Sequence, residues 1–361
     1  MEERAYTGAV VNVRTVEVLE EDTIFNRVWQ PYVEQWDDDH LIVAWGHQLN
    51  GKTDMGDLVC AVTRDGGNTW SAPIMIFDHR ALKGPRRYAY ANAALYRAPG
   101  QGIVWCFGMR CPLHVRDSEN SELVAAYSSD GGFSWMQVEL ANHFLSPLIT
   151  CSAPFKFKDR YLLPIHRNTI REDPLGDARQ FVLESTDLIR WNLAGYVPFD
   201  PDSPVFLHEA GIAQTGEEEI SLVMRTATYG YKNYSALPTS VAYRTRSMDG
   251  GRTWSVAEPE LSLHNTCSKS YYGMDGKGQE IYVYSPGPQR ERKALYYCLR
   301  PRGGEWSEPR VFYDGNNRNS YPVLVEKPGS PGEFLCVWDS SNDPDVKRSV
   351  IRFGEFNTAE G

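Results

Sequence analysis

The chain has 361 residues, with a hydrophobic fraction of 42% and a charged fraction of 23%, which is typical of a globular protein with a large core and argues against disorder. Its formal net charge of −10 argues against a nucleic-acid or anionic-membrane surface, because either partner would favour a basic field. The sequence contains no apolar stretch that could span a bilayer, and its first residues lack the apolar region of a signal peptide. We therefore expect no nucleic-acid partner and no membrane association.

The seven cysteines are odd in number and widely spaced, without a C-x-x-C pair or a zinc-site spacing. We expect them to be reduced core residues, and we expect no metal or organic cofactor. Reduced thiols favour a cytoplasmic location. A secreted or periplasmic location remains open if a signal peptide has been removed.

Taken in chain order, the sequence contains a recurring turn motif. Residues 63–70, 128–135 and 247–254 share the pattern Ser/Thr-x-Asp-Gly-Gly-x-Ser/Thr-Trp. A degenerate copy at residues 185–191 lacks the Gly-Gly pair, and residues 302–306 keep only the turn and the tryptophan. The five tryptophans recur at intervals of about 60 residues, so the chain holds about six repeats.

Each motif has the composition of a hairpin turn between two strands of one blade. The Asp and Ser/Thr side chains can bond to the backbone of the turn, and Gly-Gly supplies the positive φ angles that a tight turn requires. Short β-rich runs, such as residues 40–45, 280–284 and 334–338, lie between the motifs. These features predict an all-β fold, a six-bladed β-propeller that forms one domain over residues 1–361. We expect the ring to close by pairing residues around 9–16 with residues around 348–356.

These Asp-box repeats, in a six-bladed chain of this length, resemble the sialidase (neuraminidase and trans-sialidase) superfamily across essentially the whole sequence. Sialic acid carries a carboxylate on its anomeric carbon. The resemblance therefore implies three arginines that bind the carboxylate, a tyrosine nucleophile activated by a glutamate, and an aspartate as acid and base.

The first candidates lie near the N-terminus. Arg27, in the segment 26–31, resembles the first arginine of the family, although the proline that follows is displaced by three residues. Asp54, in the segment 52–59, resembles the acid/base aspartate, and Asp57 is the alternative.

The centre of the chain carries the clearest match. The segment 208–211 and the strand at 220–226 are similar to the family's Glu-Pro…Leu…Arg pattern, with alanine at position 210 where the family usually has proline. The resemblance implies that Glu209 is the base for the tyrosine and that Arg225 is the second arginine. His166 is a further candidate for the rim of the site.

The C-terminal part resembles the family's third arginine followed by the nucleophile. Arg292 and Tyr321 match these positions, while Pro322 replaces the common serine. Arg290 and Arg318 are alternatives for the third arginine.

The resemblance implies an exo-acting retaining glycoside hydrolase that cleaves a terminal sialic acid from glycoconjugates. Two alternatives remain: an exo-glycosidase for another acidic sugar, such as KDN, Kdo or a uronate, and a non-catalytic propeller that binds carbohydrate or protein. A neutral-sugar enzyme would need two carboxylates and no arginine trio, so the arginines count against it.

Overall fold

The computed structural model of the chain describes twelve stretches, all of them built from strands and their connections. They are residues 7–20, 24–52, 54–114, 121–142, 149–167, 180–198, 205–228, 241–265, 268–286, 292–315, 318–341 and 348–359. No helix within these stretches is long and apolar enough to cross a membrane.

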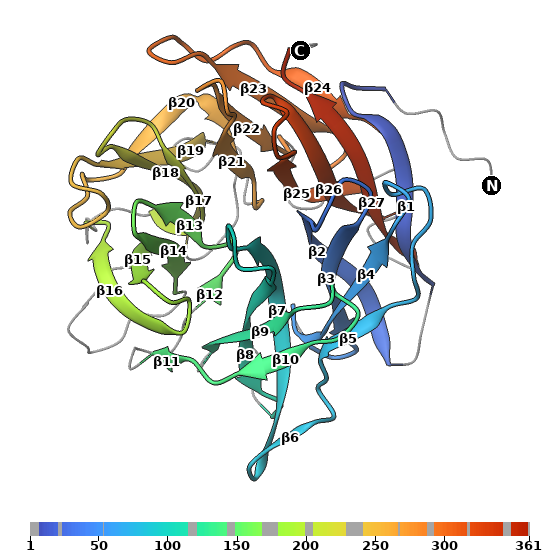
Figure 1. Ribbon diagram of the computed structural model, residues 1–361. Coiled ribbons are helices and arrows are strands. Elements are labelled where there is room, and N and C mark those ends of the chain that lie inside the picture. The colour runs from blue at the N-terminus through green and yellow to red at the C-terminus, as the bar shows by residue number, and fades with distance from the viewer. Residues whose placement is uncertain are drawn as a thin grey trace.

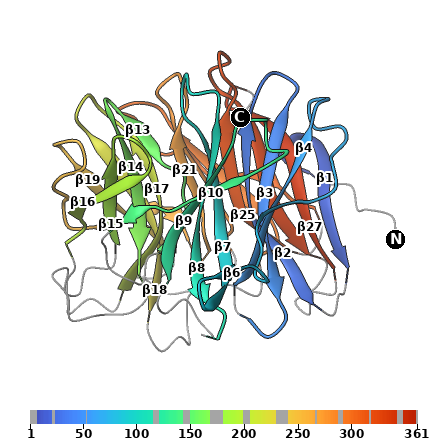
Figure 2. The same cartoon turned by 60° about the horizontal axis from the view of Figure 1, so that its bottom comes forward.

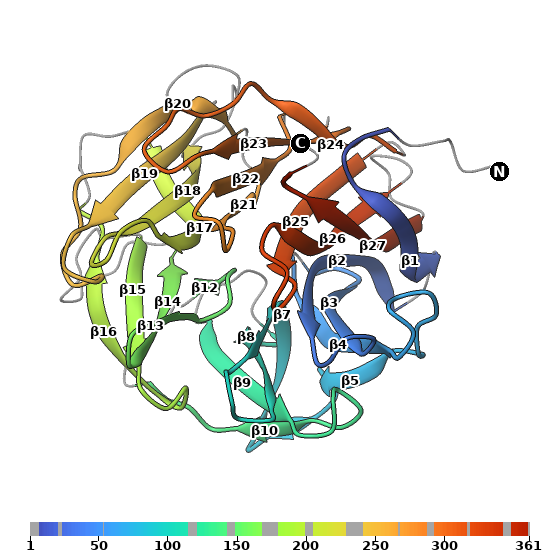
Figure 3. The ribbon, with the colours of Figure 1, turned by 45° about the horizontal axis from the view of Figure 1, so that its top comes forward.

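The strands form six blades arranged around a central axis (Figures 1 and 3), as the repeat count predicts. The first blade comprises β2 (Phe25–Gln35), β3 (Leu41–Leu49), β4 (Gly56–Thr63) and β5 (Ile74–Phe77), and the second comprises β7 (Arg86–Arg97), β8 (Val104–Pro112), β9 (Glu122–Ser128) and β10 (Met136–Val138). The third comprises β12 (Ile149–Thr150), β13 (Phe155–Phe157), β14 (Arg160–His166), β15 (Gln180–Ser185) and β16 (Arg190–Tyr196), with β11 (Ala141–Asn142) parallel to β16. The fourth comprises β17 (Val205–Gln214), β18 (Ile220–Thr228), β19 (Val241–Ser247) and β20 (Glu258–His264), and the fifth comprises β21 (Tyr271–Met274), β22 (Glu280–Tyr284), β23 (Leu295–Arg300) and β24 (Arg310–Tyr313).

The sixth blade joins the two ends of the chain. Its strands are β25 (Arg318–Glu326), β26 (Glu333–Ser341), β27 (Arg348–Asn357) and β1 (Val11–Glu20). Strand β1 pairs antiparallel with β27, from Val11 opposite Glu355 to Glu20 opposite Arg348. Figure 1 shows this pairing as the blue strand beside the red one. The predicted closure of the ring is therefore confirmed. The short strand β6 (Leu82–Lys83) forms a hairpin with β7 in the connection between the first and second blades.

The hydrophobic core lies between neighbouring blades. One cluster joins Ile42 and Cys60 of the first blade to Leu95 and Cys106 of the second. The other interblade clusters follow the same arrangement around the ring. Each blade therefore depends on its neighbours to bury its apolar faces, because a single four-stranded sheet has two faces to cover.

The Asp boxes form turns between two strands of one blade, as predicted, and the structure shows that these are the outer two strands. In the box that ends at Trp254, the Asp249 carboxylate accepts hydrogen bonds from the Thr253 amide at 2.9 Å and the Thr253 hydroxyl at 2.7 Å. The Ser247 hydroxyl accepts a hydrogen bond from the Gly251 amide at 2.7 Å, and φ of Gly251 is +93°. The indole Nε1 of Trp254 donates to the Gly251 carbonyl at 3.1 Å, which locks the tryptophan over the turn.

Viewed from the side, the inner strands run along the axis of the ring (Figure 2). An inner strand therefore crosses the molecule from one face to the other, and a residue near its middle lies halfway along the axis.

Candidate active site

Four inner strands contain a bulge near their midpoint. The register of β2, β7, β17 and β25 shifts at this point, and the residues there have positive φ angles: Gln30 at 48°, Asn92 at 61°, Glu209 at 34° and Tyr321 at 54°. A bulge bends the strand and redirects a side chain. Positive φ is uncommon outside glycine, so these positions are strained backbone sites of the kind found at functional centres.

Tyr321 lies where several blades meet at the axis. It packs in one cluster with Trp29 of the first blade, Ala91 of the second and Cys151 of the third, and its ring is 6.0 Å from that of Trp29 in an edge-on arrangement. The side chain is 6% exposed, and burial raises the pKa of its phenol. The phenol is therefore neutral near pH 7.

Two guanidinium groups flank the Tyr321 ring. The Cζ atom of Arg292 lies 5.2 Å from the ring centroid, and that of Arg27 lies 5.9 Å from it. Arg27 also pairs with Asp339, with Nη2 and Oδ2 2.6 Å apart. The arrangement brings positive charge from β2 of the first blade and from the connection between β22 and β23 of the fifth blade onto the same aromatic ring.

A further arginine, Arg318, belongs to this group. Burial and the proximity of Arg27 and Arg292 lower the pKa of Arg318. Its Nε atom is buried without a hydrogen-bond partner among the described residues. We refer to Arg27, Arg225, Arg292 and Arg318 as the arginine cluster. Cations crowded in this way favour an anionic ligand.

Glu209 is held by Arg225 on the neighbouring strand. The bulge at Glu209 leaves His208 opposite Arg225 in the ladder, and the Arg225 Nη1 donates to Glu209 Oε2 at 2.5 Å. Burial would raise the pKa of Glu209, but Arg225 and the neighbouring His166 and Lys269 outweigh it, so the pKa is lowered. Glu209 is therefore a carboxylate near neutral pH.

Asp54 faces the same centre from the connection before β4. The residue is partly open to solvent, and φ of Asp54 is +59°. Desolvation by the surrounding protein raises its pKa, while Arg27, Arg225 and Arg292 oppose the rise. The pKa of Asp54 responds to these three arginines and to Glu209, so the candidate residues lie within electrostatic range of one another.

Asp57, the alternative acid, occupies a different place. It is 1% exposed, and its Oδ1 accepts hydrogen bonds from the His79 backbone amide at 2.6 Å and the His79 ring at 2.7 Å. Together with Asp78 these side chains form a group that could hold a metal ion, with ligand atoms within 4.8 Å of one another. The hydrogen bonds from His79 already give the Asp57 carboxylate its partners, so these side chains do not require a metal.

The family model for the BNR repeat-like domain matches residues 39–335. The chain belongs to the BNR repeat-like domain family. A search against curated proteins found no significant match.

Solved structures with the same fold include proteins of several kinds. A protein of unknown function from Dyadobacter fermentans has a TM-score of 0.70 at 17% identity, over 96% of this chain and 99% of that one. The NanB sialidase of Streptococcus pneumoniae has a TM-score of 0.68 at 10% identity, over 96% of this chain and 71% of that one. The GH93 α-L-arabinofuranosidase of Fusarium graminearum has a TM-score of 0.68 at 15% identity, over 98% of this chain and 99% of that one. At these identities the likeness establishes the sialidase-type propeller fold of this BNR chain.

The structure brings together all six residues chosen from the sequence, and it adds some that the sequence reasoning did not choose. Arg290 lies outside the described residues, whereas Arg318 lies beside Arg292 rather than replacing it. Asp339 was missed because nothing in its segment of β26 distinguishes it from a strand-end aspartate. Lys269 was missed for a similar reason, because its neighbours in the sequence are small polar residues without a motif.

Proposed function

We propose that this BNR propeller is an exo-acting retaining glycoside hydrolase that removes a terminal sialic acid, or a closely related acidic sugar, from glycoconjugates. The observation that carries the proposal is the arginine cluster around Tyr321, with Glu209 and Asp54 in the same electrostatic environment. Several guanidinium groups at one point can bind a carboxylate, so the arrangement suits a sugar that carries one.

In the proposed mechanism, the arginines position the substrate. Arg27, Arg225 and Arg292 bind the sugar carboxylate, which holds the anomeric carbon at the nucleophile. Arg318 adds positive charge behind them. Because Arg27 and Arg225 are themselves oriented by Asp339 and Glu209, their guanidinium groups are fixed before the substrate arrives.

Tyr321 is the proposed nucleophile and Glu209 its base. A carboxylate nucleophile would be repelled by the carboxylate on the anomeric carbon, whereas a neutral phenol is not. As the Tyr321 oxygen bonds to the anomeric carbon, its proton passes to Glu209 and the glycosidic bond breaks.

Asp54 is the proposed acid and base. Its raised pKa favours the protonated form that donates to the departing glycosidic oxygen, whereas the lowered pKa of Glu209 keeps that group ready to accept. Environments that push two pKa values apart in this way assign the acid and base roles. In the second step Asp54 takes a proton from water, the water oxygen bonds to the anomeric carbon, and the Tyr321 oxygen leaves and recovers its proton from Glu209.

The known proteins with this fold support a glycosidase, and they divide between acidic and neutral sugars in their names. A neutral-sugar enzyme could use Asp54 and Glu209 as a carboxylate pair. It would have no use for four arginines at the sugar, because a neutral ring offers them no anion. The arginine cluster therefore favours the acidic sugar.

The test is a panel of 4-methylumbelliferyl glycosides offered to the purified protein: the α-N-acetylneuraminide, the KDN analogue, the glucuronide and the α-L-arabinofuranoside. We expect release of the fluorophore from the neuraminide. Tyr321→Phe should lower kcat by about three orders of magnitude or more, because a nucleophile is lost. Tyr297→Phe, which changes a buried tyrosine between blades five and six, is the matched control and should keep near-normal turnover.

Each other result has a meaning. Activity on the KDN or glucuronide substrate alone would support carboxylate binding by the arginine cluster, but it would replace sialic acid with another acidic sugar as the substrate. Turnover of the arabinofuranoside with Tyr321→Phe fully active would contradict the proposal, and so would inactivity on every substrate by a correctly folded protein.

A further inference from the structure

A cavity lies on the axis, on the other side of the axial residues from the arginine cluster. Its volume is about 500 Å³. Its walls are the halves of the inner strands that follow the axial residues: residues 211–214 follow Glu209, residues 322–324 follow Tyr321, and residues 152–156 follow Cys151. The arginine cluster lies on the opposite side, because Arg318 precedes Tyr321 and Arg225 is paired with His208. We call this space the far-face cavity.

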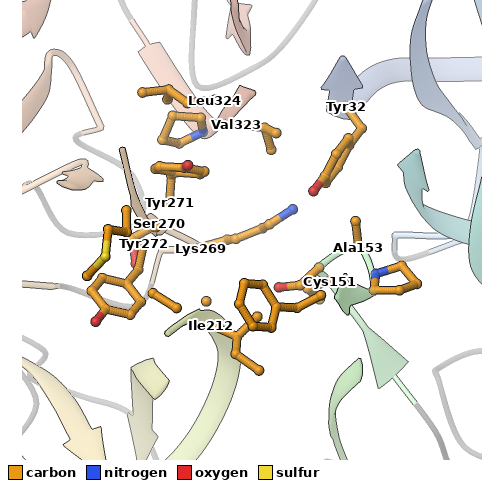
Figure 4. Close-up of a pocket in the computed structure, with 18 of the residues that line it drawn as sticks. Tyr32, Cys151, Ala153, Ile212, Lys269, Ser270, Tyr271, Tyr272, Val323 and Leu324 are labelled. Carbon is orange, nitrogen blue, oxygen red and sulfur yellow. The ribbon is translucent and has the colours of Figure 1, made fainter. Parts of the chain in front are cut away.

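One buried cation reaches into the far-face cavity. Lys269 is 6% exposed and contributes to the lining. Figure 4 shows its amine in the space between Tyr32 and Cys151. Among the described residues, the Lys269 amine has no hydrogen-bond acceptor and no ion-pair partner. Burial lowers the pKa of this amine, and Cys151, Glu209 and Asp339 act in the opposite direction. A buried amine without an acceptor is energetically costly, so an acceptor in the cavity would stabilise the folded protein.

The other charged side chains of the lining are already engaged. The Asp275 carboxylate accepts hydrogen bonds from the Thr358 hydroxyl at 3.1 Å and the Lys277 amide at 3.0 Å. Lys156 is exposed, and its amine lies 4.3 Å from the centroid of the Tyr161 ring. Lys269 therefore provides the one inward-facing charge among the described lining residues.

Several of the remaining lining residues are aromatic or aliphatic, and they stand beside serine and glutamine side chains. In Figure 4 the amine end of Lys269 points toward Tyr32, while Tyr271 and Leu324 lie toward the other end of its side chain. Gly273 leaves room for the Tyr271 hydroxyl, since a Cβ at position 273 would lie 2.3 Å from that oxygen. A space of this size, with aromatic and aliphatic side chains in its walls, a few polar groups among them and one buried amine at its inner end, has the form of a small-molecule site.

We propose that the far-face cavity binds a small organic carboxylate with a ring-shaped body. The carboxylate accepts hydrogen bonds from Lys269 at the inner end, and the ring packs between the tyrosines. This site adjoins the sugar site, because Lys269 also lowers the pKa of Glu209, but binding in the cavity does not depend on the proposed hydrolase activity.

The test uses benzoate as the probe and benzyl alcohol as its uncharged counterpart, with binding followed by ligand-detected NMR on the full chain. We expect benzoate to bind and benzyl alcohol to bind at least tenfold more weakly. Lys269→Met, which keeps the apolar stem and removes the charge, should weaken benzoate binding at least tenfold. Lys156→Met makes the same change at the exposed rim and should leave the affinity within about twofold.

A crystal soaked in benzoate then locates the carboxylate. We expect it within hydrogen-bonding distance of the Lys269 amine. Benzoate found only at the arginine cluster, equal binding by benzyl alcohol, or unchanged affinity in Lys269→Met would overturn the proposal. If Lys269→Met does not fold, reductive methylation of the unmodified protein replaces it: benzoate should protect Lys269 and leave Lys156 reactive, and equal labelling of Lys269 with and without benzoate would reject the site.

Discussion

Asp54, Glu209 and Tyr321 all have left-handed backbone conformations. For a residue with a β-carbon this conformation costs on the order of 1 kcal/mol or more, and it persists where the surrounding structure fixes it. Two of these residues sit at bulges where the ladder register shifts. The strained residues are therefore the ones that we propose as the nucleophile, the base and the acid.

The charges around Glu209 and Asp54 predict the pH dependence of activity. Glu209 must be deprotonated to act as a base, and Arg225 lowers its pKa, so the acid limb of kcat/KM should lie below the ordinary glutamate pKa of 4.5. Asp54 must be protonated to act as an acid, and desolvation by the surrounding protein raises its pKa, so the alkaline limb should lie above the ordinary aspartate pKa of 3.8. Arg225→Met should move the acid limb to higher pH by about 1 to 3 units, because the lowering charge is lost.

The measurement is kcat/KM across the pH range for both proteins. Arg246→Met is the control, because Arg246 lies on the same blade, is 49% exposed and pairs with Glu219. Its acid limb should stay in place. An unchanged acid limb in Arg225→Met would remove Glu209 from the role of base, even if overall activity fell.

The six candidate residues could be found from the sequence because each lies in a short local pattern, such as the segment around Glu209. Arg318 and Asp339 could not be assigned, because their positions depend on contacts between blades. Asp339 lies more than 300 positions from Arg27 along the chain, yet their side chains are hydrogen-bonded. Contacts of this kind are set by ring closure and not by local sequence.

At the scale of the element, the Asp box acts as a self-contained turn. Asp249 accepts hydrogen bonds from the Ser247 hydroxyl, the Arg252 amide and the Thr253 amide and hydroxyl. Asp249→Ala should lower the free energy of unfolding by roughly 1 to 3 kcal/mol, since several donors lose their acceptor. Chemical denaturation would measure the loss, and kcat should be unchanged.

The same carboxylate predicts a pH dependence of stability. Burial raises the pKa of Asp249, but the hydrogen bonds from Thr253 and Ser247 outweigh it and lower the pKa to about 2. Its contribution is therefore present above pH 3.8 and is lost as the pH falls through about 2, so the difference between wild type and Asp249→Ala should shrink over that interval. Asp38→Ala, at an exposed turn, is the control and should change stability little at any pH. An equal loss in both variants would contradict a specific role for the box.

The sequence predicted the three full boxes well because their hydrogen bonds are local and their glycines are visible. The degenerate box shows what a motif search does not reveal. Leu188 adopts φ of +65° where the other boxes have glycine, and its side chain is fully buried among Phe107, Leu163 and Trp191. Burial of a leucine stabilises by about 2 kcal/mol, which offsets the strain of the backbone.

At the scale of the molecule, stability depends on closing the ring. Val16 of β1 is 7% exposed and packs with Val28 of the first blade and Ile351 of the sixth. Val16→Asp should lower the free energy of unfolding by roughly 3 kcal/mol or more, because it buries an unpaired carboxylate. Val11→Asp, on the same strand but 49% exposed, is the matched control and should cost little. Comparable stability of the two variants in thermal denaturation would show that the closing strand contributes little to the fold.

The repeat count and the pairing of the chain ends were predictable because propeller closure is a consequence of topology. The far-face cavity was not, because its lining is drawn from four inner strands and Tyr32, none of which carries a motif on that side. Sequence motifs identify residues that form turns or carry charge. The cavity on the axis depends on how the blades are arranged in the ring, which no motif describes.

The most direct test of the central proposal is to trap the covalent intermediate. A sialic acid with fluorine at carbons 2 and 3 supplies a good leaving group and slows the second step, because fluorine destabilises the oxocarbenium-like transition state. The protein would be incubated with this reagent, digested and analysed by mass spectrometry. The account predicts one fluorosialyl group on the Tyr321 side chain. An adduct on Glu209 or Asp54, or no adduct from a protein that hydrolyses the neuraminide, would contradict it.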